Sequence, residues 1–436
     1  MDALYDEDFE RVRSALGELH PAEIADLLES LPLEPRERIW EQLAPERYAE
    51  VLAEVESGVR TARLEQMQPV EVAAVASDVD PDDAADMLQD LPEPFIEEVL
   101  QALDAQNRQR IEQVLQYDED TAGGLMNTDV ITIRPDVTLG TVVRYLRWRG
   151  EIPVLTNRLM VVDRENRLVG VLRLALLLIA DEDSKVEDHM ELFPGLNARA
   201  PVSDVVTVFE QRDFISAPVV DDEGKLLGRI TIDDVVDQIE KQAERSMMHM
   251  AGLEEGRDLF ESVISTARRR TPWLGVNLAT ALLASWVIGL FEATLQQVVA
   301  LAILMPVVAS MGGIAGSQTL TVVTRGLALG QVGSNNARDL LMKELRVGIV
   351  SSVIWALVVA LVAGLWFADP AIGLVGGCAI IVNLVVAAVA GAIIPLSLKQ
   401  LGVDPALAGG VLLTTVTDVI GFMAFLGLGT VLLLPA

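Results

Sequence analysis

The chain has 436 residues, 51% of them hydrophobic, and a formal net charge of −31. The segment from Thr271 to the end contains six acids and five bases, so subtracting its −1 leaves −30 for residues 1–270. This negative charge excludes nucleic acid as a partner and favours cations, although solubility alone would also account for it. The single cysteine, Cys378, excludes an intrachain disulfide framework.

Residues from about 8 to 117 predict an acidic, all-helical domain, because apolar residues recur at spacings of three and four. Residues 25–32 resemble residues 85–92, sixty positions further on, which indicates repeated helical hairpins packed as a small superhelix. Asp82, Asp86 and Asp90 are stacked at i, i+4 and i+8, where like charges destabilise one another. Either solvent screens these acids or a cation lies against them.

Residues from about 126 to 246 alternate short β-branched runs with helical patterns. Residues 159–172 predict a strand, a turn and a strand, and residues 217–230 repeat the pattern 58 positions later. This tandem repeat resembles a pair of CBS domains, a regulatory module that often binds adenosine nucleotides. In the second copy Thr231 and Asp234 resemble the ribose-contacting positions of such modules, which implies ATP as a candidate ligand. The first copy has mostly apolar residues, 174–179, at the matching place.

A polar helical pattern from Val235 to about Phe260 predicts a connecting helix. Five apolar segments follow, each near the roughly 20 residues that a membrane-spanning helix needs. The predicted spans are 272–291, 295–324, 347–367, 372–398 and 405–434. The flanking arginines 268–270, the basic loop 325–346 and Lys399 all fall on one side of the membrane. The positive-inside rule therefore places the acidic half in the cytoplasm and the C-terminus outside.

The last span carries one carboxylate, Asp418, in its middle, and an intramembrane acid is by default a functional-site hypothesis. Thr414 and Thr415 precede Asp418 by four and three residues, so a helix places all three on one face. Oxygen ligands of this kind suit a hard cation such as Mg²⁺. The alternatives are a protonated Asp418 or one paired with a buried base, but the bases of this half lie at predicted helix ends or in one loop.

The second span contains a glycine-rich stretch, residues 310–321, with Gly312 and Gly316 at the spacing that lets another helix approach closely. Gln318, Ser317 and Thr321 bring oxygens to a similar depth. The stretch is either a helix-packing motif alone or, beside a span that carries a carboxylate, part of a pore wall.

Together these features resemble the MgtE family of bacterial magnesium channels across nearly the whole chain. The most specific motifs are residues 312–318, 404–406 and 414–418. The resemblance implies a multi-domain membrane protein with an all-α N-terminal superhelical domain, α/β tandem CBS domains, a connecting (plug) helix and a five-helix transmembrane domain. The expected boundaries are 1–120, 121–185, 186–234, 235–262 and 263–436.

In this family two subunits form one pore, so the resemblance implies a homodimer with one Asp418 from each subunit. It also implies that the hydrated ion is surrounded by Gly313, Ser317, Thr321 and the backbone carbonyl of Thr414. High cytoplasmic Mg²⁺ would close the pore by binding between the helical domain, the CBS pair and the plug helix. The matching acids, listed along the chain, are Asp82, Asp86, Asp213, Asp234 and Asp237.

The sequence departs from the family pattern at two places. Ile314 stands where the glycine motif usually carries Asn, and Ser317 stands where some members carry a second Asn. In the plug, Gln242, Arg245 and Ser246 replace acids of other members, which implies weaker Mg²⁺ sensing or fewer bound ions.

The predicted function is Mg²⁺ influx through a channel in the bacterial cytoplasmic (inner) membrane, with Co²⁺, Mn²⁺ and Ni²⁺ as further candidate ions. The alternative is an H⁺- or Na⁺-coupled divalent cation carrier, and a third class is a membrane-tethered nucleotide sensor without transport. An enzyme is not expected, because the sequence has no spaced Ser/His/Asp set, no phosphate loop and no metal-hydrolase histidine pair.

Overall fold

The computed structural model describes residues 9–253, 258–328, 330–333 and 335–434. The chain forms two compact units. The first comprises Met1–Glu244 with Gly256–Glu261, and the second comprises Arg245–Glu255 with Ser262–Ala436. The first unit thus contains most of the expected soluble half, and the second contains the five expected spans.

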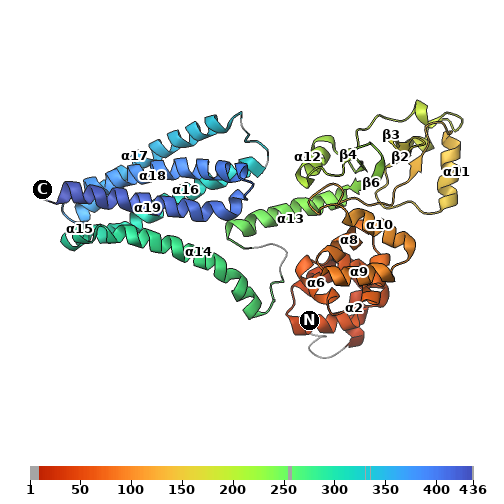
Figure 1. Cartoon of the computed structure of the whole chain (residues 1–436), viewed down its shortest axis with the longest axis horizontal. Coiled ribbons are helices and arrows are strands. Elements are labelled where there is room, and N and C mark those ends of the chain that lie inside the picture. Colours follow the sequence, from red (N-terminus) through yellow and green to blue (C-terminus); the bar gives the residue numbers. More distant parts are fainter. Residues whose placement is uncertain (1–8, 254–257, 329, 334, 435–436) are drawn as a thin grey trace. The chain divides into compact units, whose positions relative to one another are not determined.

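The N-terminal part of the first unit is helical, as predicted (Figure 1). Its helices are short and amphipathic, and several begin at proline, whose missing N–H costs nothing in a first turn. The elements are α2 (Phe9–Glu18), α3 (Pro21–Glu29), α4 (Leu33–Gln42), η1 (Pro45–Arg47), α5 (Tyr48–Glu54), α6 (Ser57–Leu64), α7 (Pro69–Ser77), α8 (Pro81–Gln89), α9 (Glu93–Ala102) and α10 (Ala105–Leu115).

The repeated phrase that the sequence shows at residues 25–32 and 85–92 forms the buried faces of α3 and α8. Ile24 and Leu28 of α3 are fully buried, and so are Ala84 and Leu88 of α8. These side chains belong to one continuous core that also includes Phe209 of the following domain. The helical domain and the second α/β repeat are thus packed as one body within the first unit.

Two three-stranded sheets follow, with the same topology. In each sheet a short parallel strand pairs with the first strand of an antiparallel hairpin. The register of each hairpin shifts between the last two residues of its first strand, which leaves one residue of the second strand as a bulge. The offset of 58 residues holds for both hairpin strands, which confirms the tandem CBS-like repeat. The strands are β1 (Thr132–Ile133), β2 (Arg158–Val162) and β3 (Leu168–Arg173), then β4 (Leu196–Asn197), β5 (Ser216–Val220) and β6 (Leu226–Thr231).

The repeats carry few regular helices besides these strands. The first has α11 (Leu139–Arg149) with the short turns η2 (Leu174–Leu178) and η3 (Val186–Asp188), and the second has α12 (Val202–Arg212). The two repeats are joined at their hairpin turns, where Leu168 N donates to Gly224 O at 2.9 Å.

The connecting helix, α13 (Ile232–Met250), ends ten residues earlier than predicted. The polar helical pattern continues to Phe260, but the chain turns at Gly252, whose φ is +70°. A side chain at Gly252 would collide with the indole of Trp273, so the turn packs against the following helix within the second unit. Residues 254–257 of the predicted connecting helix lie outside the described residues.

The second unit contains, among the residues described, five helices long and apolar enough to cross a membrane. The five predicted spans are confirmed, and the helices of the first, third and fourth spans are longer than predicted. A short extra helix, α15 (Glu292–Gln297), precedes the second span. The membrane-length helices are α14 (Val263–Gly289), α16 (Val299–Ala328), α17 (Ala337–Trp366), α18 (Pro370–Gln400) and α19 (Pro405–Leu433).

Helix α18 is central in this unit because it packs against α16, α17 and α19 (Figure 1). More than half of the residues in the most apolar stretch of α18 are buried, whereas 11% are buried in the corresponding stretch of α14. Small residues of α18 allow this close packing, and the exposed apolar side chains of α14 and α17 suit contact with lipid.

Candidate ion pathway and regulatory sites

The predicted pathway residues of α16 lie on one face of that helix. Gly313, Ser317 and Thr321 are four residues apart, and a methyl group added at Gly313 would meet no atom within 4 Å. Ser317 and Thr321 are exposed, while Gly312 and Gly316 are buried against neighbouring helices. The packing role of the glycine-rich stretch is therefore confirmed, and its role in a pore wall stays a prediction. Its buried face packs helices, and its other face remains open.

The predicted pathway residues of α19 are also on an open face. Thr414 is exposed, and Thr415 and Asp418 are partly exposed. The Thr414 and Thr415 hydroxyls donate to the carbonyls of Gly410 and Val411 at 2.9 and 2.7 Å. Each hydroxyl hydrogen is thereby used within the helix, and the oxygen lone pairs remain available to accept from a hydrated cation.

Asp418 has no ion-pair or hydrogen-bond partner among the residues that the structure describes. The alternative of a structural pair with a buried base therefore finds no support within the chain. Lys399, the only basic residue of the last two spans, instead donates from Nζ to Leu327 O at 3.3 Å. An unpaired acid in the middle of a membrane helix is the pattern of an ion or proton site.

The open faces of α16 and α19 flank one tight helix–helix contact. A methyl group at Gly316 would lie 2.8 Å from Leu413 Cδ1, and one at Gly409 would lie 2.9 Å from Leu320 Cδ1. Ser317 follows Gly316 and Thr414 follows Leu413, so both hydroxyls lie beside this contact. The structure thus brings the two predicted sets of pathway residues to the same part of the membrane half.

A second carboxylate inside this half was not singled out from the sequence. Glu344 of α17 is only 7% exposed. Its Oε2 accepts from Thr319 Oγ1 of α16 at 3.3 Å, and its Oε1 lies 3.7 Å from Lys343 Nζ. A functional role for Glu344 was hard to predict from the sequence, because this residue lies near the start of α17 among basic residues, where acidic side chains are common.

In the first unit, the predicted sensor acids of the helical domain and the connecting helix come together. Lys241 Nζ of α13 lies 3.8 Å from Asp86 Oδ2 of α8, which places the two helices side by side. Asp82 is 8% exposed, and its Oδ1 has no hydrogen-bond partner among the described residues. Aspartates of these two helices raise one another's pKa and form the α8–α13 acidic cluster, which comprises Asp80, Asp82, Asp83 and Asp86 with Asp233, Asp234 and Asp237.

Burial and mutual repulsion perturb the acids of this cluster. Burial raises the pKa of Asp82 well above its ordinary value, and the charge of Asp234 raises it further. Burial, followed by the charge of Asp234, raises the pKa of Asp83 from 3.8 to about 7. Burial and the neighbouring Asp233 raise the pKa of Asp234 to about 7 as well. Buried like charges without enough cations are the signature of a place where a cation would be stabilising.

Two features limit what the cluster offers a metal. In the part of the chain that the structure describes, no three of its carboxylates converge into a ready-made metal site. Asp213, the fifth predicted sensor acid, is exposed at the C-terminal cap of α12 with a φ of 51°. It makes no bond to the α8–α13 cluster in this single chain.

Two contacts that were not predicted from the sequence involve residues at the end of α13 and between α13 and α14. In the first unit, the guanidinium of buried Arg36 donates to both carboxylate oxygens of Asp258, from Nη1 at 2.5 Å and from Nη2 at 2.7 Å. Burial raises the pKa of Asp258, but the bonds and charge of Arg36 together with the hydrogen bond from Phe260 N hold the pKa below its ordinary value. In the second unit, His249 Nδ1 at the end of α13 lies 2.5 Å from Asp404 Oδ2, whose other oxygen caps the first turn of α19.

The predicted nucleotide residues lie together at the end of β6. Thr231 donates from its backbone N to Asp234 Oδ2 at 3.1 Å, and its Oγ1 lies within hydrogen-bond distance of both Asp233 Oδ1 and Asp234 Oδ2. Nearby, Ser216, the strand partner of Thr231, donates to Asn157 Oδ1 at 2.7 Å. The next residue, Arg158, has its guanidinium over the rings of Phe193 and Phe214 at 5.4 and 5.0 Å. Its Nε and Nη1 are buried without a partner among the described residues.

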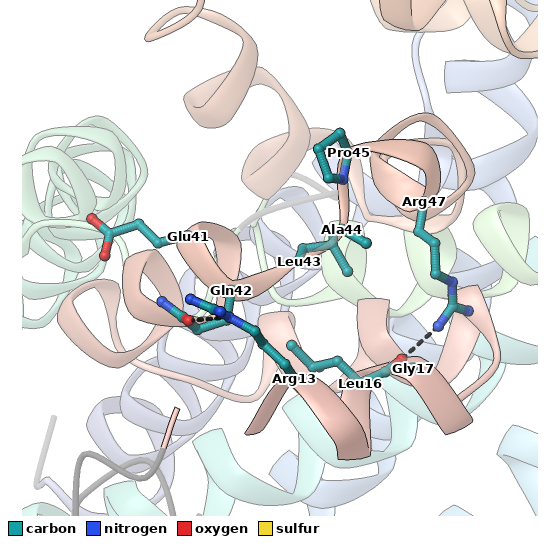
Figure 2. Close-up of a pocket in the computed structure, with 9 residues that line it drawn as sticks. All are labelled: Arg13, Leu16, Gly17, Glu41, Gln42, Leu43, Ala44, Pro45 and Arg47. Carbon is teal, nitrogen blue, oxygen red and sulfur yellow. Dashed lines mark hydrogen bonds between the residues drawn. The ribbon is translucent and has the colours of Figure 1, made fainter. Parts of the chain in front are cut away.

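A pocket of about 390 Å³ lies elsewhere, in the helical domain between α2, α4 and η1 (Figure 2). Arg13 Nε donates to Gln42 Oε1 at 2.9 Å, and Arg47 Nη1 donates to Leu16 O at 2.5 Å. Both arginines thus hold local structure. The charged lining residues are these two arginines and one carboxylate, Glu41, so the pocket has a net positive charge and is a poor candidate for a Mg²⁺ site.

These features define a class of protein: a multi-pass membrane protein with a soluble helical and CBS-like half and a carboxylate-bearing helix bundle. Comparisons with known proteins agree. The family model described as MgtE, divalent cation transporter, matches residues 305–428. The model of the MgtE intracellular N domain matches residues 19–120, and that of the CBS domain matches residues 122–182 and 193–241.

Relatives extend over nearly the full chain. The magnesium transporter MgtE of Thermus thermophilus is 30% identical, covering 99% of this chain and 97% of that protein. The magnesium transporter MgtE of Bacillus subtilis is 29% identical, covering 96% and 93%. The crystal structure of the cytosolic domain of the Mg²⁺ channel MgtE in complex with ATP is similar with a TM-score of 0.50 and 31% identity, covering 54% of this chain and 97% of that one.

The chain therefore belongs to the MgtE family of divalent cation transporters. Members of this family are transporters and not enzymes. The predicted architecture is confirmed: a helical N domain, a CBS pair and membrane helices in that order.

Proposed function

We propose that the chain forms a Mg²⁺-selective channel that admits Mg²⁺ into the cell, with Asp418 in the ion pathway. The observation that carries the proposal is the unpaired carboxylate of Asp418 on the open face of α19, beside the open face of α16. The names of the relatives, magnesium transporters, support Mg²⁺ as the ion. Mg²⁺ uptake into liposomes by wild-type protein and by Asp418→Ala tests the proposal.

The residue types fit a hydrated ion better than a stripped one. Mg²⁺ gives up its waters reluctantly, and its six waters donate hydrogen bonds outward. Carboxylate, hydroxyl and carbonyl oxygens along α16 and α19 accept such bonds. An inside-negative potential drives a divalent cation inward with about 4.6 kcal/mol per 100 mV, so influx needs no other coupling. Co²⁺, Mn²⁺ and Ni²⁺ have the same charge and are candidate competitors.

The functional unit is a homodimer in this proposal, because one chain supplies one Asp418 and two balance the charge of Mg²⁺. The exposed oxygens of α16 and α19 also need a second wall to enclose an ion. We expect a detergent-corrected mass of twice the 47.2 kDa of one chain in solution. Light scattering coupled to size exclusion measures it. A monomeric mass together with full transport activity would contradict the dimer.

The proposed orientation places the soluble half in the cytoplasm, the membrane half in the bacterial inner membrane and the C-terminus outside. It rests on the basic residues that flank the spans on one side, at 268–270, in the loop before α17 and at Lys399. The soluble half is then exposed to cytoplasmic Mg²⁺ and nucleotides.

Cytoplasmic Mg²⁺ closes the channel in this proposal by binding at the α8–α13 acidic cluster. The cluster joins the helical domain to the connecting helix, so neutralising it draws α8 and α13 together. Two contacts then transmit the change. Arg36 holds Asp258 just before α14, and His249 holds the N-terminal cap of α19, the helix of Asp418. A cation shifts the equilibrium only through its higher affinity for the closed arrangement.

ATP binds the CBS pair in this proposal, with Thr231 and Asp234 at the ribose. The relative whose cytosolic domain is solved with ATP supports this ligand. The partnerless N–H groups of Arg158 add a place for the phosphates, because guanidinium donors pair well with phosphate oxygens. Asp234 also belongs to the acidic cluster, so Mg²⁺ and ATP would meet at one carboxylate.

Arg158→Ala should weaken ATP binding at least about tenfold, since charge-assisted hydrogen bonds contribute about 1.5–3 kcal/mol. Isothermal titration of the purified full chain with ATP measures the affinity. Arg173→Ala, an exposed arginine opposite Arg158 in the same hairpin, is the matched control and should bind normally. Equal loss in both variants would contradict a specific role for Arg158.

Glu344 favours the alternative function, an H⁺- or Na⁺-coupled carrier. A buried carboxylate that hydrogen-bonds a threonine of the pathway helix is a group that can take up a proton during transport. In that case Mg²⁺ movement would follow a pH or Na⁺ gradient, and Glu344→Gln would abolish the coupling. A channel would instead conduct Mg²⁺ without either gradient.

A further inference from the structure

Asn383 is an asparagine buried completely within the membrane half. It lies near the middle of α18, and its exposed fraction is 0%. Its Nδ2 donates to the backbone carbonyl of Val308 in α16 at 2.8 Å. Its Oδ1 is also buried and has no hydrogen-bond partner among the described residues. Neither the sequence motifs nor the proposed pathway uses this residue.

Two glycines from different helices hold the amide of Asn383 between them. A methyl group added at Gly312 of α16 would lie 2.3 Å from Asn383 Nδ2. One added at Gly421 of α19 would lie 2.8 Å from the same atom. Both distances are too short for any side chain, so both helix backbones lie directly against the amide. Asn383 is therefore the point at which α16, α18 and α19 meet.

An unpartnered polar atom in such a place is unfavourable, because a buried amide oxygen loses its bonds to water. A leucine has the same number of side-chain heavy atoms and carries no such penalty. The amide contributes something that leucine lacks: a directional bond to a backbone carbonyl, which fixes the position of α18 along α16. Interhelical hydrogen bonds of this kind set geometry in membrane bundles.

The two glycines that contact the Asn383 amide are close in sequence to residues of the proposed pathway. Gly312 is followed by Gly313, the first of the open positions of α16. Gly421 lies three residues after Asp418, which is about one turn of α19. A shift of α16 or α19 at the amide would therefore change the separation between Gly313 and Asp418, two residues of the proposed ion pathway.

We propose that Asn383 is a positioning residue that sets the separation of α16 and α19 and thereby the preference of the pathway for Mg²⁺ over Ca²⁺. This inference rests on the proposed function. Mg²⁺ requires near-ideal octahedral geometry, whereas Ca²⁺ accepts 6–8 oxygens in variable geometry. A fixed cage of oxygens favours the small ion with its ordered waters. A loosened cage loses that advantage and admits Ca²⁺.

The test compares Mg²⁺ and Ca²⁺ uptake into liposomes that contain equal amounts of folded, full-length protein. Asn383→Leu keeps the branched side chain and removes the bond to Val308, and the ratio of Mg²⁺ to Ca²⁺ uptake should fall at least about tenfold. Gly421→Ala keeps the amide but displaces it, and should lower the ratio in the same direction. Gly427→Ala, on the same helix with nothing within 4 Å of the added methyl, should leave the ratio unchanged.

A double variant separates packing from positioning. Gly312→Ala alone should give little folded protein, because its methyl collides with the amide. Gly312→Ala with Asn383→Ala removes the collision and should restore the yield but not the ion ratio. An unchanged ratio in Asn383→Leu and in Gly421→Ala, with normal Mg²⁺ uptake, would overturn the inference alone. Absence of Mg²⁺ uptake in wild type and in Gly427→Ala would instead refute the proposed function and this inference with it.

Discussion

Replacing Asp418 by alanine should reduce Mg²⁺ uptake into liposomes at least about a hundredfold. Two unit charges about 4 Å apart attract each other by about 4 kcal/mol at an effective dielectric constant near 20. Each 1.36 kcal/mol corresponds to a factor of ten in an equilibrium constant, so about 4 kcal/mol corresponds to nearly a thousandfold. The variant also loses the desolvation penalty of the carboxylate, which leaves an expected reduction of at least about a hundredfold. Asp418→Asn, which keeps the shape and loses the charge, should fail similarly.

Charge loss elsewhere in the membrane half provides the control. Glu292→Gln removes one negative charge from an exposed position at the start of α15, and uptake should stay within about twofold of wild type. Equal yields of folded protein, checked by size exclusion, separate loss of transport from loss of folding. Normal uptake by Asp418→Ala would refute the pathway assignment.

The second large effect concerns the α8–α13 acidic cluster in the absence of Mg²⁺. Raising the pH from about 5 to 8 should make the soluble half more susceptible to limited proteolysis in the full-length protein. The pKa values of Asp83 and Asp234 are raised from 3.8 to about 7, so the folded state holds protons that the unfolded state has lost. Stability therefore falls as the pH rises between about 4 and 7, on the order of a few kcal/mol.

Millimolar Mg²⁺ should remove most of this pH dependence, because a bound cation stabilises the ionised carboxylates. Asp82→Asn combined with Asp234→Asn should weaken the dependence on pH, leaving the part that burial of Asp83 causes, and should remove most of the dependence on Mg²⁺. It should also raise the Mg²⁺ concentration that closes the channel, without changing the uptake rate when the channel is open. Glu210→Gln, on the exposed surface of α12, is the matched charge control.

The Mg²⁺ concentration that closes the channel should also differ from that of other family members. Gln242, Arg245 and Ser246 stand where other members carry acids, so closure should require more Mg²⁺ here than in members with the full set. If protection from proteolysis does not depend on Mg²⁺, or if the double variant leaves the midpoint of closure unmoved, the sensor assignment fails while the pathway assignment stands.

The sequence predicted those features that repeat or that depend on hydropathy. The five spans were found because a bilayer demands about 20 apolar residues in a row, and the CBS-like pair was found because its pattern recurs after 58 residues. The end of the connecting helix was misplaced by ten residues. The polar helical pattern continues past Met250, and the turn at Gly252 depends on a contact with Trp273 that periodicity does not encode.

The residues that were missed act through contacts distant in sequence. Asn383 is 75 residues from Val308, and Arg36 is 222 residues from Asp258. Neither lies in a motif, and a single asparagine or arginine at a helical position carries no local signal. Asp418, by contrast, was found because a charge inside an apolar segment is unusual whatever its neighbours are.

The most direct test of the central claim is the reversal potential of the current through the purified wild-type protein in a lipid bilayer. With a tenfold Mg²⁺ gradient, low Mg²⁺ on the cytoplasmic side and no pH or Na⁺ gradient, the account predicts a current that reverses about 30 mV from zero, at the Mg²⁺ equilibrium potential. The same current should stop when Mg²⁺ is raised on the cytoplasmic side. A current that appears only with a pH or Na⁺ gradient, and reverses with that gradient, would contradict the channel and establish the coupled carrier.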